Sequence, residues 1–586
     1  MLKSKKALKN VIYFEQSIEN GVGFEPVYET DEISEYKLSF NFKKTVAVKD
    51  FKLKINVPMH GIISTFAPTL RRNKWLRQWF APVTSRSEYY FGSPFISAVD
   101  HGKDNYCTVA LSDGEFSHEL SLSVNDFEEK NNLDFIVNLF VESKRIKNYS
   151  VIIRIDKRKT ELSKVLSSLT EWWDGLYPQI APLPENRGFP LYSSWYNFHQ
   201  HPESELLIKE LELAAEIGFK TLIIDDGWQY DGNGTGDYYD CGDWEVSKEK
   251  FPDLKRFVQK ANAFGISVML WFPLPFAGFN TKAYNIFKDK LLYEEGFNIR
   301  AGVLDPRYKE VREHIIGTVC SLVGNYGLNG VKLDFLDSFS VKPETPKYND
   351  SMDYADVDVS TVKLMDEMVK ALKEINKNIL IEFRQAYVGP SVTKHCNMLR
   401  VGDCAFDSTT NRIGIGDMRL MNYKCAVHSD MLYWANTESV FNCRRQLLDI
   451  MFSCPQISVL LTNSTEDQIA LLKNFVTYYR ENKDILLYGK FTAYGIDIGY
   501  SAMSAENDYK RIAVIYQANN YVFDGKKVDL FNATNSERLV VYNDEEKNLA
   551  IKVYDLFGKL LSEKENRQKV IALTVFSGGY VTIEQK

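Results

Sequence analysis

The sequence lacks the patterns of several common protein classes. Its eight cysteines include no CxxC pair, which fits neither a zinc site nor a disulfide-dense secreted scaffold, so reduced thiols are expected. No stretch approaches ~18 uncharged apolar residues, and the basic start MLKSKKALKNVIYFEQ lacks the apolar run and cleavage site of a signal peptide. We expect a cytoplasmic protein without a membrane partner, or a secreted or periplasmic one if a signal segment has been removed.

Neither sign of charge dominates. The 71 basic and 78 acidic residues give a net charge of −7, which predicts no binding to nucleic acid or to an anionic membrane. Uncharged small molecules are the expected partners, and a homo-oligomer remains open.

The length and composition indicate a large globular protein. At 586 residues the chain exceeds what one hydrophobic core usually serves, so two to four domains are expected. Aromatic residues make up 13% of the chain, which suits both β-sandwich cores and sites where sugars stack.

The first part of the chain is rich in strand patterns. Short alternating runs such as YKLSFNF, FKLKINV and SVIIRI are separated by Gly, Asp and Asn turns, which predicts an N-terminal β-sandwich over residues 1–160. A helical stretch and the proline-rich PQIAPLPENRGFP follow, which predicts a linker over residues 161–187.

The hydrophobic period then changes. Six strand-like runs alternate with amphipathic helices, of which the first is expected to stop at Gly218, and KCAVH and QISVLL raise the count to eight. This predicts a catalytic (β/α)8 TIM barrel over residues 188–485, with a doubly wound parallel sheet as the alternative. Residues 486–586 return to strand patterns and predict a small C-terminal β-sandwich, so the fold class is multidomain α/β.

Carboxylates follow several of the predicted barrel strands. In a parallel barrel the carboxyl ends of the strands carry the catalytic side chains. The polar residues at these ends are Asp225 and Asp226 with Trp228 just after, Lys332 and Asp334, Glu382 and Arg384, and Arg400 and Asp403. Acids gathered at one barrel mouth, without His or Cys spacing for a metal or a thiol nucleophile, are the components of glycoside hydrolysis. No metal or organic cofactor is expected.

The acids also have structural interpretations. Asp225 and Asp226 could cap a helix, although adjacent acids before Gly and Trp suit the binding of sugar hydroxyls. Asp334 could pair with Lys332, but an Asp inside the apolar run GVKLDF favours catalysis. Asp403 could be a turn residue, and Asp407 lies close to it as a rival.

For the other candidates the sequence does not decide clearly between a structural role and contact with substrate. Trp195 and Trp271 fit either barrel-core packing or sugar stacking. Glu382 and Arg384 favour a neutralising pair beneath the site, and the segment HSDMLYW brings Asp430 either into a surface loop or into contact with substrate.

The segments SSWYNF, IIDDGWQ, GISVMLWF, NGVKLDF, LRVGD and VHSDMLYW occur in an order that resembles the α-galactosidases of the melibiase family, glycoside hydrolase family 36, and their raffinose-synthase-like relatives. The resemblance covers most of the chain. The sequence departs from the family pattern at Gly402, where the family has Ser, at Cys404, and at EFRQAYVGP, which replaces a Cys-Gly-Gly region.

The resemblance implies roles for the candidate residues. Asp334 would be the nucleophile and Asp403 the general acid/base, with its proton held by burial or by repulsion. The residues expected to bind substrate are Asp225, Asp226, Trp228, Trp195, Trp271, Lys332, Arg384, Arg400 and Asp430. The implied function is a retaining hydrolase that removes terminal α-linked galactose from an oligosaccharide or glycoside. The alternatives are an α-galactosyl transglycosylase and a catalytically silent sugar-binding protein.

Overall fold

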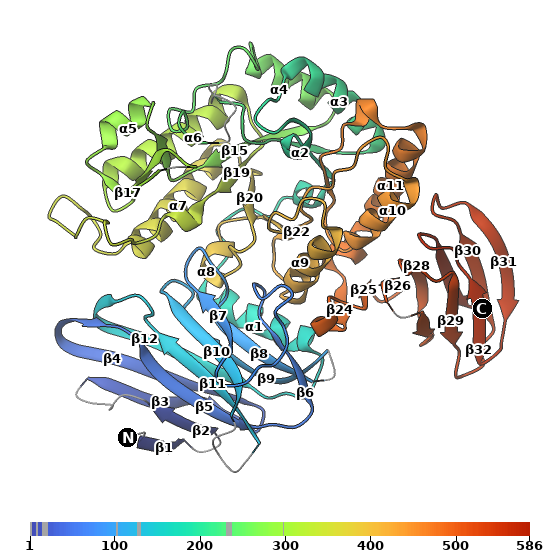
Figure 1. The fold of residues 1–586 in the computed structure, drawn as a ribbon, viewed down its shortest axis with the longest axis horizontal. Coiled ribbons are helices and arrows are strands. Elements are labelled where there is room, and N and C mark those ends of the chain that lie inside the picture. The colour runs from blue at the N-terminus through green and yellow to red at the C-terminus, as the bar shows by residue number, and fades with distance from the viewer. Residues whose placement is uncertain are drawn as a thin grey trace.

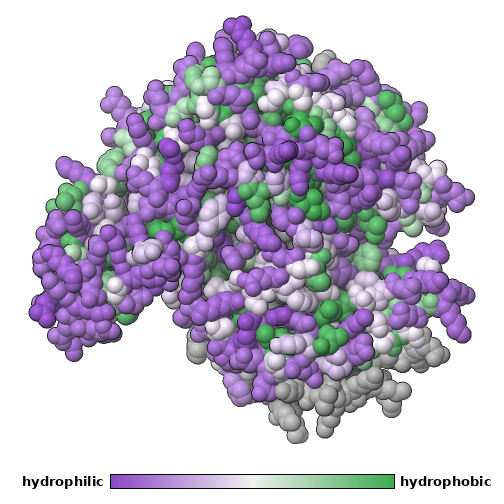
Figure 2. Space-filling view, turned by 180° about the vertical axis from the view of Figure 1, so that it is seen from behind, coloured by the Kyte–Doolittle hydropathy of each residue, from purple (hydrophilic) through white to green (hydrophobic). Residues whose placement is uncertain are grey.

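The computed structural model describes residues 3–7, 10–14, 21–100, 103–125, 131–229, 237–296, 298–517 and 519–586. Figure 1 shows a strand-rich N-terminal part, a central part in which helices surround strands, and a C-terminal part of strands to one side. The opposite face of the molecule is mostly hydrophilic, with apolar residues in separate patches (Figure 2). Within the described ranges, no helix combines the length and the apolar character needed to cross a membrane.

The N-terminal part consists of two six-stranded sheets with the orders β1-β2-β5-β11-β10-β7 and β3-β4-β12-β9-β8-β6. The alternating run in β4 turns Tyr36, Leu38 and Phe40 into the core, where they pack with residues from the other sheet. The strands are β1 Lys3–Ala7, β2 Asn10–Phe14, β3 Val22–Glu29, β4 Ile33–Val48, β5 Phe51–Pro58, β6 Ile62–Phe66, β7 Val83–Ser87, β8 Phe95–Asp100, β9 Asp104–Leu111, β10 His118–Asn125, β11 Asn132–Leu139 and β12 Lys144–Asp156.

A single helix, α1 (Leu162–Leu176), connects this part to the centre of the molecule. The predicted limit at residue 160 falls between β12 and this helix. Trp173 of α1 is buried and donates its indole N–H to the carbonyl oxygen of Leu111 at 2.8 Å. The helix therefore holds the N-terminal sheets against the barrel as well as linking the two along the chain.

Eight parallel strands form the central sheet, in the order β22-β21-β20-β19-β15-β14-β13-β23. A parallel bridge between His428 of β22 and Cys454, two residues before β23, closes the ring. The predicted (β/α)8 barrel is therefore confirmed, and the doubly wound alternative is wrong. The strands are β13 Leu191–Ser193, β14 Thr221–Ile224, β15 Ser267–Pro273, β19 Gly330–Asp334, β20 Leu380–Arg384, β21 Met398–Arg400, β22 Ala426–His428 and β23 Gln456–Ile457.

The barrel interior explains which side chains reach the mouth. Five fully buried residues from five strands form a separate apolar cluster: Leu191, Ile223, Met269, Leu380 and Met398. Because side chains two residues apart share a face of a strand, the residues that follow these along each strand also point inward, nearer the carboxyl ends. Those residues are Ser193, Asp225, Trp271, Glu382, Arg384 and Arg400, and on β19 the row continues through Lys332 and Asp334.

Helices surround the barrel and follow the expected alternation. The helix α3 ends at Gly218, whose positive φ of 114° needs a residue without a side chain, as the sequence predicts. The helices are α2 Trp195–Phe198, α3 Ser204–Ile217, α4 Leu254–Ala263, α5 Lys282–Phe287, α6 Lys309–Tyr326, α7 Val357–Ile375, α8 Pro390–Thr393, α9 Ser408–Leu420, α10 Val440–Asp449 and α11 Glu466–Tyr488. The predicted limit at residue 485 falls within α11.

Two further sets of strands flank the barrel. A three-stranded sheet between β15 and β19 consists of β16 Phe276–Gly278, β17 Leu291–Glu295 and β18 Ala301–Leu304. After α11 the chain forms a seven-stranded and a three-stranded sheet that share an apolar core, a small β-sandwich. Its strands are β24 Lys490–Tyr494, β25 Ala502–Glu506, β26 Lys510–Ile515, β27 Asn520–Val522, β28 Lys527–Asn532, β29 Arg538–Tyr542, β30 Leu549–Tyr554, β31 Leu560–Asn566, β32 Val570–Thr574 and β33 Tyr580–Gln585.

A buried ion pair joins the three parts of the chain. Lys74, from the N-terminal part, donates to Asp417 of α9 at 2.5 Å, and both side chains are almost fully buried. Tyr500, which follows β24, donates its hydroxyl to the same carboxylate. Burial raises the pKa of Asp417 to about 6, although Lys74 opposes that shift. The negative charge of Asp417 in this buried junction is therefore balanced by Lys74.

Replacing Lys74 by Met is expected to destabilise the protein by about 3–5 kcal/mol, because the substitution leaves a buried carboxylate without its partner. Without Lys74 the pKa of Asp417 rises further, so the loss should be largest at alkaline pH and should shrink as pH falls and the carboxyl of the variant takes up a proton. Thermal unfolding across pH measures both effects. As a control, Lys282→Met removes the exposed pair with Glu245 and should change stability little. A loss for Lys74→Met no larger than that of the control would contradict the prediction.

Candidate active site

Asp334 occupies the carboxyl end of β19 and is 8% exposed. One of its oxygens, Oδ1, accepts from Arg384 Nε at 2.5 Å and from the backbone N–H of Phe335 at 2.7 Å. The other, Oδ2, accepts from Trp271 Nε1 at 3.1 Å. Donors on three sides fix the direction in which this carboxylate points.

The surroundings of Asp334 keep it ionised. Burial alone would raise its pKa, but the charges of Arg384 and Lys332 and the hydrogen bonds from Arg384 and Trp271 outweigh burial and hold the pKa well below its usual value. An ionised, oriented carboxylate with a depressed pKa is what a nucleophile in double displacement requires.

Asp225 and Asp226 directly follow β14, which β15 separates from β19 in the ring, and are each 3% exposed. Asp225 accepts from Lys332 Nζ at 2.6 Å. Asp226 accepts from the side-chain amides of Gln200 at 2.7 Å and Gln229 at 3.1 Å, and burial raises its pKa to about 6. The helix-cap interpretation is wrong for the described residues, since the next helix there, α4, takes its cap from Asp253.

Asp403 lies in the loop after β21, and its side chain is 67% exposed. Arg400 Nη1 lies 2.9 Å from its Oδ1 and lowers its pKa, with a smaller lowering from Lys332. The charge of Asp334 acts on Asp403 in the opposite direction, so the two carboxylates share one electrostatic environment. The expectation that burial holds a proton on Asp403 is wrong for the protein without substrate, because the loop leaves this side chain open to water.

The rival carboxylate Asp407 has a different role. It accepts from the backbone N–H of Thr410 at 2.9 Å and so caps the N-terminus of α9. Arg72 of the N-terminal part pairs with its other oxygen at 2.9 Å. A carboxylate engaged by both a helix end and an arginine is poorly placed to transfer protons, which favours Asp403 as the acid.

Arg400 is 1% exposed and lies beneath the Asp403 loop. It donates to Asp430 at 2.5 Å and lies 3.7 Å from Glu382. Asp430, also 1% exposed, further accepts at Oδ2 from the Tyr196 hydroxyl at 2.9 Å and from the backbone N–H of Cys404 at 2.8 Å. Arg400 and Asp430 therefore support the loop, and the sugar contacts that the sequence predicts for them stay a prediction.

Glu382 and Arg384 do not form the neutralising pair that the sequence favours. Arg384 extends to Asp334, whereas Glu382 is fully buried and accepts from Gln456 Nε2. Burial raises the pKa of Glu382 to about 7, although Lys332 and Arg400 oppose that shift. Asp334 on the adjacent strand β19 and Gln456 on β23 supply these contacts, and the local sequence specifies neither neighbour.

The three predicted tryptophans have three different environments. Trp228 is fully buried and donates its indole N–H to the carbonyl oxygen of Trp271 at 2.8 Å, so it supports the site from behind and does not match the predicted sugar contact. Trp271 is 3% exposed and orients Asp334. Trp195 begins α2 just after β13 and is only partly buried, so its ring remains a candidate wall for a sugar.

Two aromatic residues near the site, Tyr238 and Phe335, are not among the residues that the sequence predicts. Tyr238, in the segment between β14 and β15, has its ring centroid 5.9 Å from that of Trp271 and 5.2 Å from that of Phe335. Phe335 directly follows Asp334 with a positive φ of 59°, a conformation that is uncommon for a bulky residue. The adjacency of Phe335 to the K-x-D motif was a signal for it, whereas Tyr238 has no signal in its local sequence.

The departure at Gly402 has a structural reason. A Cβ atom at this position would lie 2.8 Å from Nη2 of Arg71 and 3.0 Å from the carbonyl oxygen of Gln385. The N-terminal part of the chain thus fills the space that a serine side chain would need.

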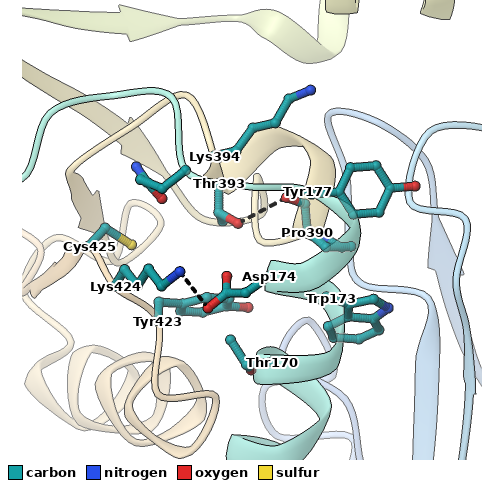
Figure 3. A pocket seen from close by; sticks show the side chains of 11 residues that line it. Thr170, Trp173, Asp174, Tyr177, Pro390, Thr393, Lys394, Tyr423, Lys424 and Cys425 are labelled. Atoms are coloured by element: carbon teal, nitrogen blue, oxygen red, sulfur yellow. Dashed lines mark hydrogen bonds and ion pairs between the residues drawn. The ribbon is translucent and has the colours of Figure 1, made fainter.

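The cavity in Figure 3 lies away from these carboxylates. Side chains of α1, α8 and the segment just before β22 enclose about 20 Å³, enough for about one water molecule and far too little for a sugar. Lys424 and Asp174 form an ion pair of 2.9 Å at its wall. Among the residues that the structure describes, no group of three or more His, Cys, Asp or Glu side chains is arranged to hold a metal ion.

The fold and the site together define a class: a (β/α)8 barrel whose mouth holds an ionised carboxylate beside a second, exposed one, as in barrel glycoside hydrolases. The family model described as Melibiase matches residues 187–384. This segment of the chain is therefore similar to the melibiase family, and the relatives and solved structures named below are α-galactosidases.

Similar proteins carry α-galactosidase names. The chain is 30% identical over 158 residues to alpha-galactosidase 2 of Pediococcus pentosaceus, a match that covers 26% of this chain and 22% of that protein. It is 27% identical over 151 residues to alpha-galactosidase AgaA of Geobacillus stearothermophilus, covering 25% and 20%. The matched segments thus span about a fifth of the length of these relatives.

Solved structures share the fold over nearly the whole chain. A GH36 α-galactosidase AgaA variant from Geobacillus stearothermophilus, in complex with 1-deoxygalactonojirimycin, has a TM-score of 0.68 at 13% identity and covers 98% of this chain and 83% of that one. The α-galactosidase from Lactobacillus brevis has a TM-score of 0.63 at 12% identity and covers 100% and 86%. At these identities the likeness concerns the fold.

Proposed function

We propose that this protein is a retaining glycoside hydrolase that removes terminal α-linked galactose, or a close analogue, from oligosaccharides or glycosides. The observation that carries the proposal is Asp334: a carboxylate at the end of a barrel strand, oriented by Arg384 and Trp271 and kept ionised. The names of the related proteins support galactose as the sugar.

In the proposed reaction, Asp334 attacks the anomeric carbon while Asp403 donates a proton to the departing glycosidic oxygen. The bond between the anomeric carbon and that oxygen breaks, and a covalent β-glycosyl ester forms on Asp334. Asp403, now ionised, removes a proton from a water molecule that attacks the same carbon and releases Asp334. Two inversions at one carbon retain the α configuration.

The remaining polar residues bind and position the sugar. Asp225 and Asp226 lie on the strand that neighbours β15 and offer acceptor oxygens for sugar hydroxyls. Lys332 neutralises Asp225 and adds positive charge near Asp334, so it acts on the binding of the sugar and on the ionisation of the nucleophile. Trp195 provides a wall for the ring.

The test is hydrolysis of p-nitrophenyl α-galactoside and of several other p-nitrophenyl α-glycosides, with proton NMR of the first sugar released. We expect hydrolysis of the α-galactoside, with the α anomer appearing before mutarotation. Release of the β anomer would contradict a retaining mechanism. Binding of galactose without turnover would indicate a silent sugar-binding protein, and transfer to added sucrose in preference to water would indicate a transglycosylase.

Asp226→Asn is expected to lower kcat/KM by about 10- to 100-fold on natural and aryl α-galactosides alike, because the variant loses an acceptor for a sugar hydroxyl without affecting the proton transfer. Steady-state kinetics on the two substrates measures the ratio. If only the natural substrate, with its poor leaving group, were affected, Asp226 would act as an acid catalyst and the assignment would be wrong.

A further inference from the structure

An exposed aromatic side chain follows the candidate acid. Phe406 lies three positions after Asp403 in the chain and is 78% exposed. Its ring centroid lies 5.5 Å from that of Tyr433, edge to face, and 6.5 Å from that of Tyr196 at an interplanar angle of 31°. Tyr196 of α2 and Tyr433, in the segment after β22, thus pack against this ring, which otherwise stays open to water.

The chain holds Phe406 in this position from both sides. Before it, the backbone N–H of Cys404 is bound to the buried Asp430 at 2.8 Å. After it, Asp407 donates its backbone N–H to the carbonyl oxygen of Cys404 at 3.0 Å and caps α9. Phe406 has a positive φ of 61°, which a bulky residue rarely adopts. The loop therefore holds an apolar ring in solvent with a backbone conformation that is unfavourable for phenylalanine.

The chemistry of the proposed reaction places the leaving group beside this ring. A general acid must lie within hydrogen-bond reach of the glycosidic oxygen, so the leaving sugar extends from a point next to the Asp403 carboxyl. Asp225, Asp226 and Asp334 lie deep in the barrel, whereas Asp403 is open to water, so the leaving sugar lies on the outer side of Asp403. The apolar faces of sugar rings stack on aromatic side chains.

We propose that Phe406, backed by Tyr196 and Tyr433, is the platform on which the leaving-group sugar of the substrate stacks. This inference rests on the proposed function. It assigns the leaving-group side of the site to a neutral sugar ring, since Arg72, which reaches this loop from the N-terminal part, is already paired with Asp407. Phe406 binds the leaving group and takes no part in proton transfer.

The experiment compares two substrates that carry the same galactose but different leaving groups. An α-galactosyl disaccharide places a sugar on the platform, whereas α-galactosyl fluoride leaves it empty. We expect Phe406→Ala to lower kcat/KM for the disaccharide by about 10-fold and to change kcat/KM for the fluoride less than twofold. Phe406→Trp should restore most of the activity on the disaccharide. Tyr509→Ala removes an equally exposed ring (83%) from the C-terminal β-sandwich and should change neither rate.

The outcomes separate the platform from the proposed function. Equal losses on both substrates for Phe406→Ala would overturn the platform, because the substitution would then act through Asp403 or the loop. No loss on the disaccharide would overturn it as well. If the wild-type protein hydrolysed neither substrate, the proposed function itself would fail, and the platform with it.

Discussion

Replacing Asp334 by Asn is expected to lower kcat/KM by at least about 10⁴-fold on every α-galactoside, whatever its leaving group. The amide keeps the shape of the carboxylate but cannot form the glycosyl ester, and no other carboxylate occupies the same point between Arg384 and Trp271. Kinetics on an aryl galactoside and on a disaccharide measures the loss, and thermal unfolding checks that the variant is folded. Comparable losses on both substrates are expected, because both need the nucleophile.

Asp337 offers a matched control for this variant. Its carboxylate also lies near Arg384, at 3.4 Å, but it is 42% exposed and follows the strand end rather than forming it. Asp337→Asn changes the local charge as Asp334→Asn does and should cost less than about 10-fold. A large loss for Asp337→Asn together with a small one for Asp334→Asn would move the nucleophile to Asp337.

Azide gives a second test of Asp334. In Asp334→Gly, the anion should fill the vacated space and displace an activated α-glycoside directly, which yields the β-azide.

The features of the site that the sequence predicted are those that depend on strand period. Once eight strands are recognised, alternation along each strand places Asp225, Lys332 and Asp334 on the inward face at the carboxyl ends, and the structure has them there. The barrel itself is predicted because strand-like and helix-like hydrophobic patterns alternate along this part of the sequence. Local patterns such as IIDDGW and GVKLDF contain this information because strand residues and site residues are continuous in sequence.

The partners of these residues depend on neighbours distant in the sequence. Arg384 reaches Asp334 on the adjacent strand instead of Glu382 two positions away, and Trp228 packs behind Trp271 instead of facing the mouth. The exposure of Asp403 and the position of Phe406 follow from a loop that is anchored on Asp430, a residue from a different strand end. No local pattern specifies these contacts, because each depends on how separate loops meet at the barrel mouth.

Asp403→Ala should show the opposite pattern to Asp334→Asn, with a loss that depends on the leaving group. We expect a loss of about 10²- to 10⁴-fold on an unactivated disaccharide, which needs a proton on its departing oxygen, and a much smaller loss in the formation of the covalent intermediate from an activated aryl galactoside. Because Arg400 lowers the pKa of Asp403, the protonated fraction of this acid falls early as pH rises. The wild-type kcat/KM on the disaccharide should therefore decline from acidic toward neutral pH.

Azide identifies the role of Asp403 through product stereochemistry. In Asp403→Ala the anion needs no general base, so it should attack the accumulated β-linked glycosyl-enzyme where activated water would have entered and release an α-glycosyl azide. Asp407→Ala removes a carboxylate four positions further along the chain and serves as the comparison. Because Asp407 caps α9 and pairs with Arg72, its loss should lower stability and give no azide product. An α-azide from Asp407→Ala, with near-normal disaccharide hydrolysis by Asp403→Ala, would assign the acid to Asp407 and leave Arg400 without a catalytic partner.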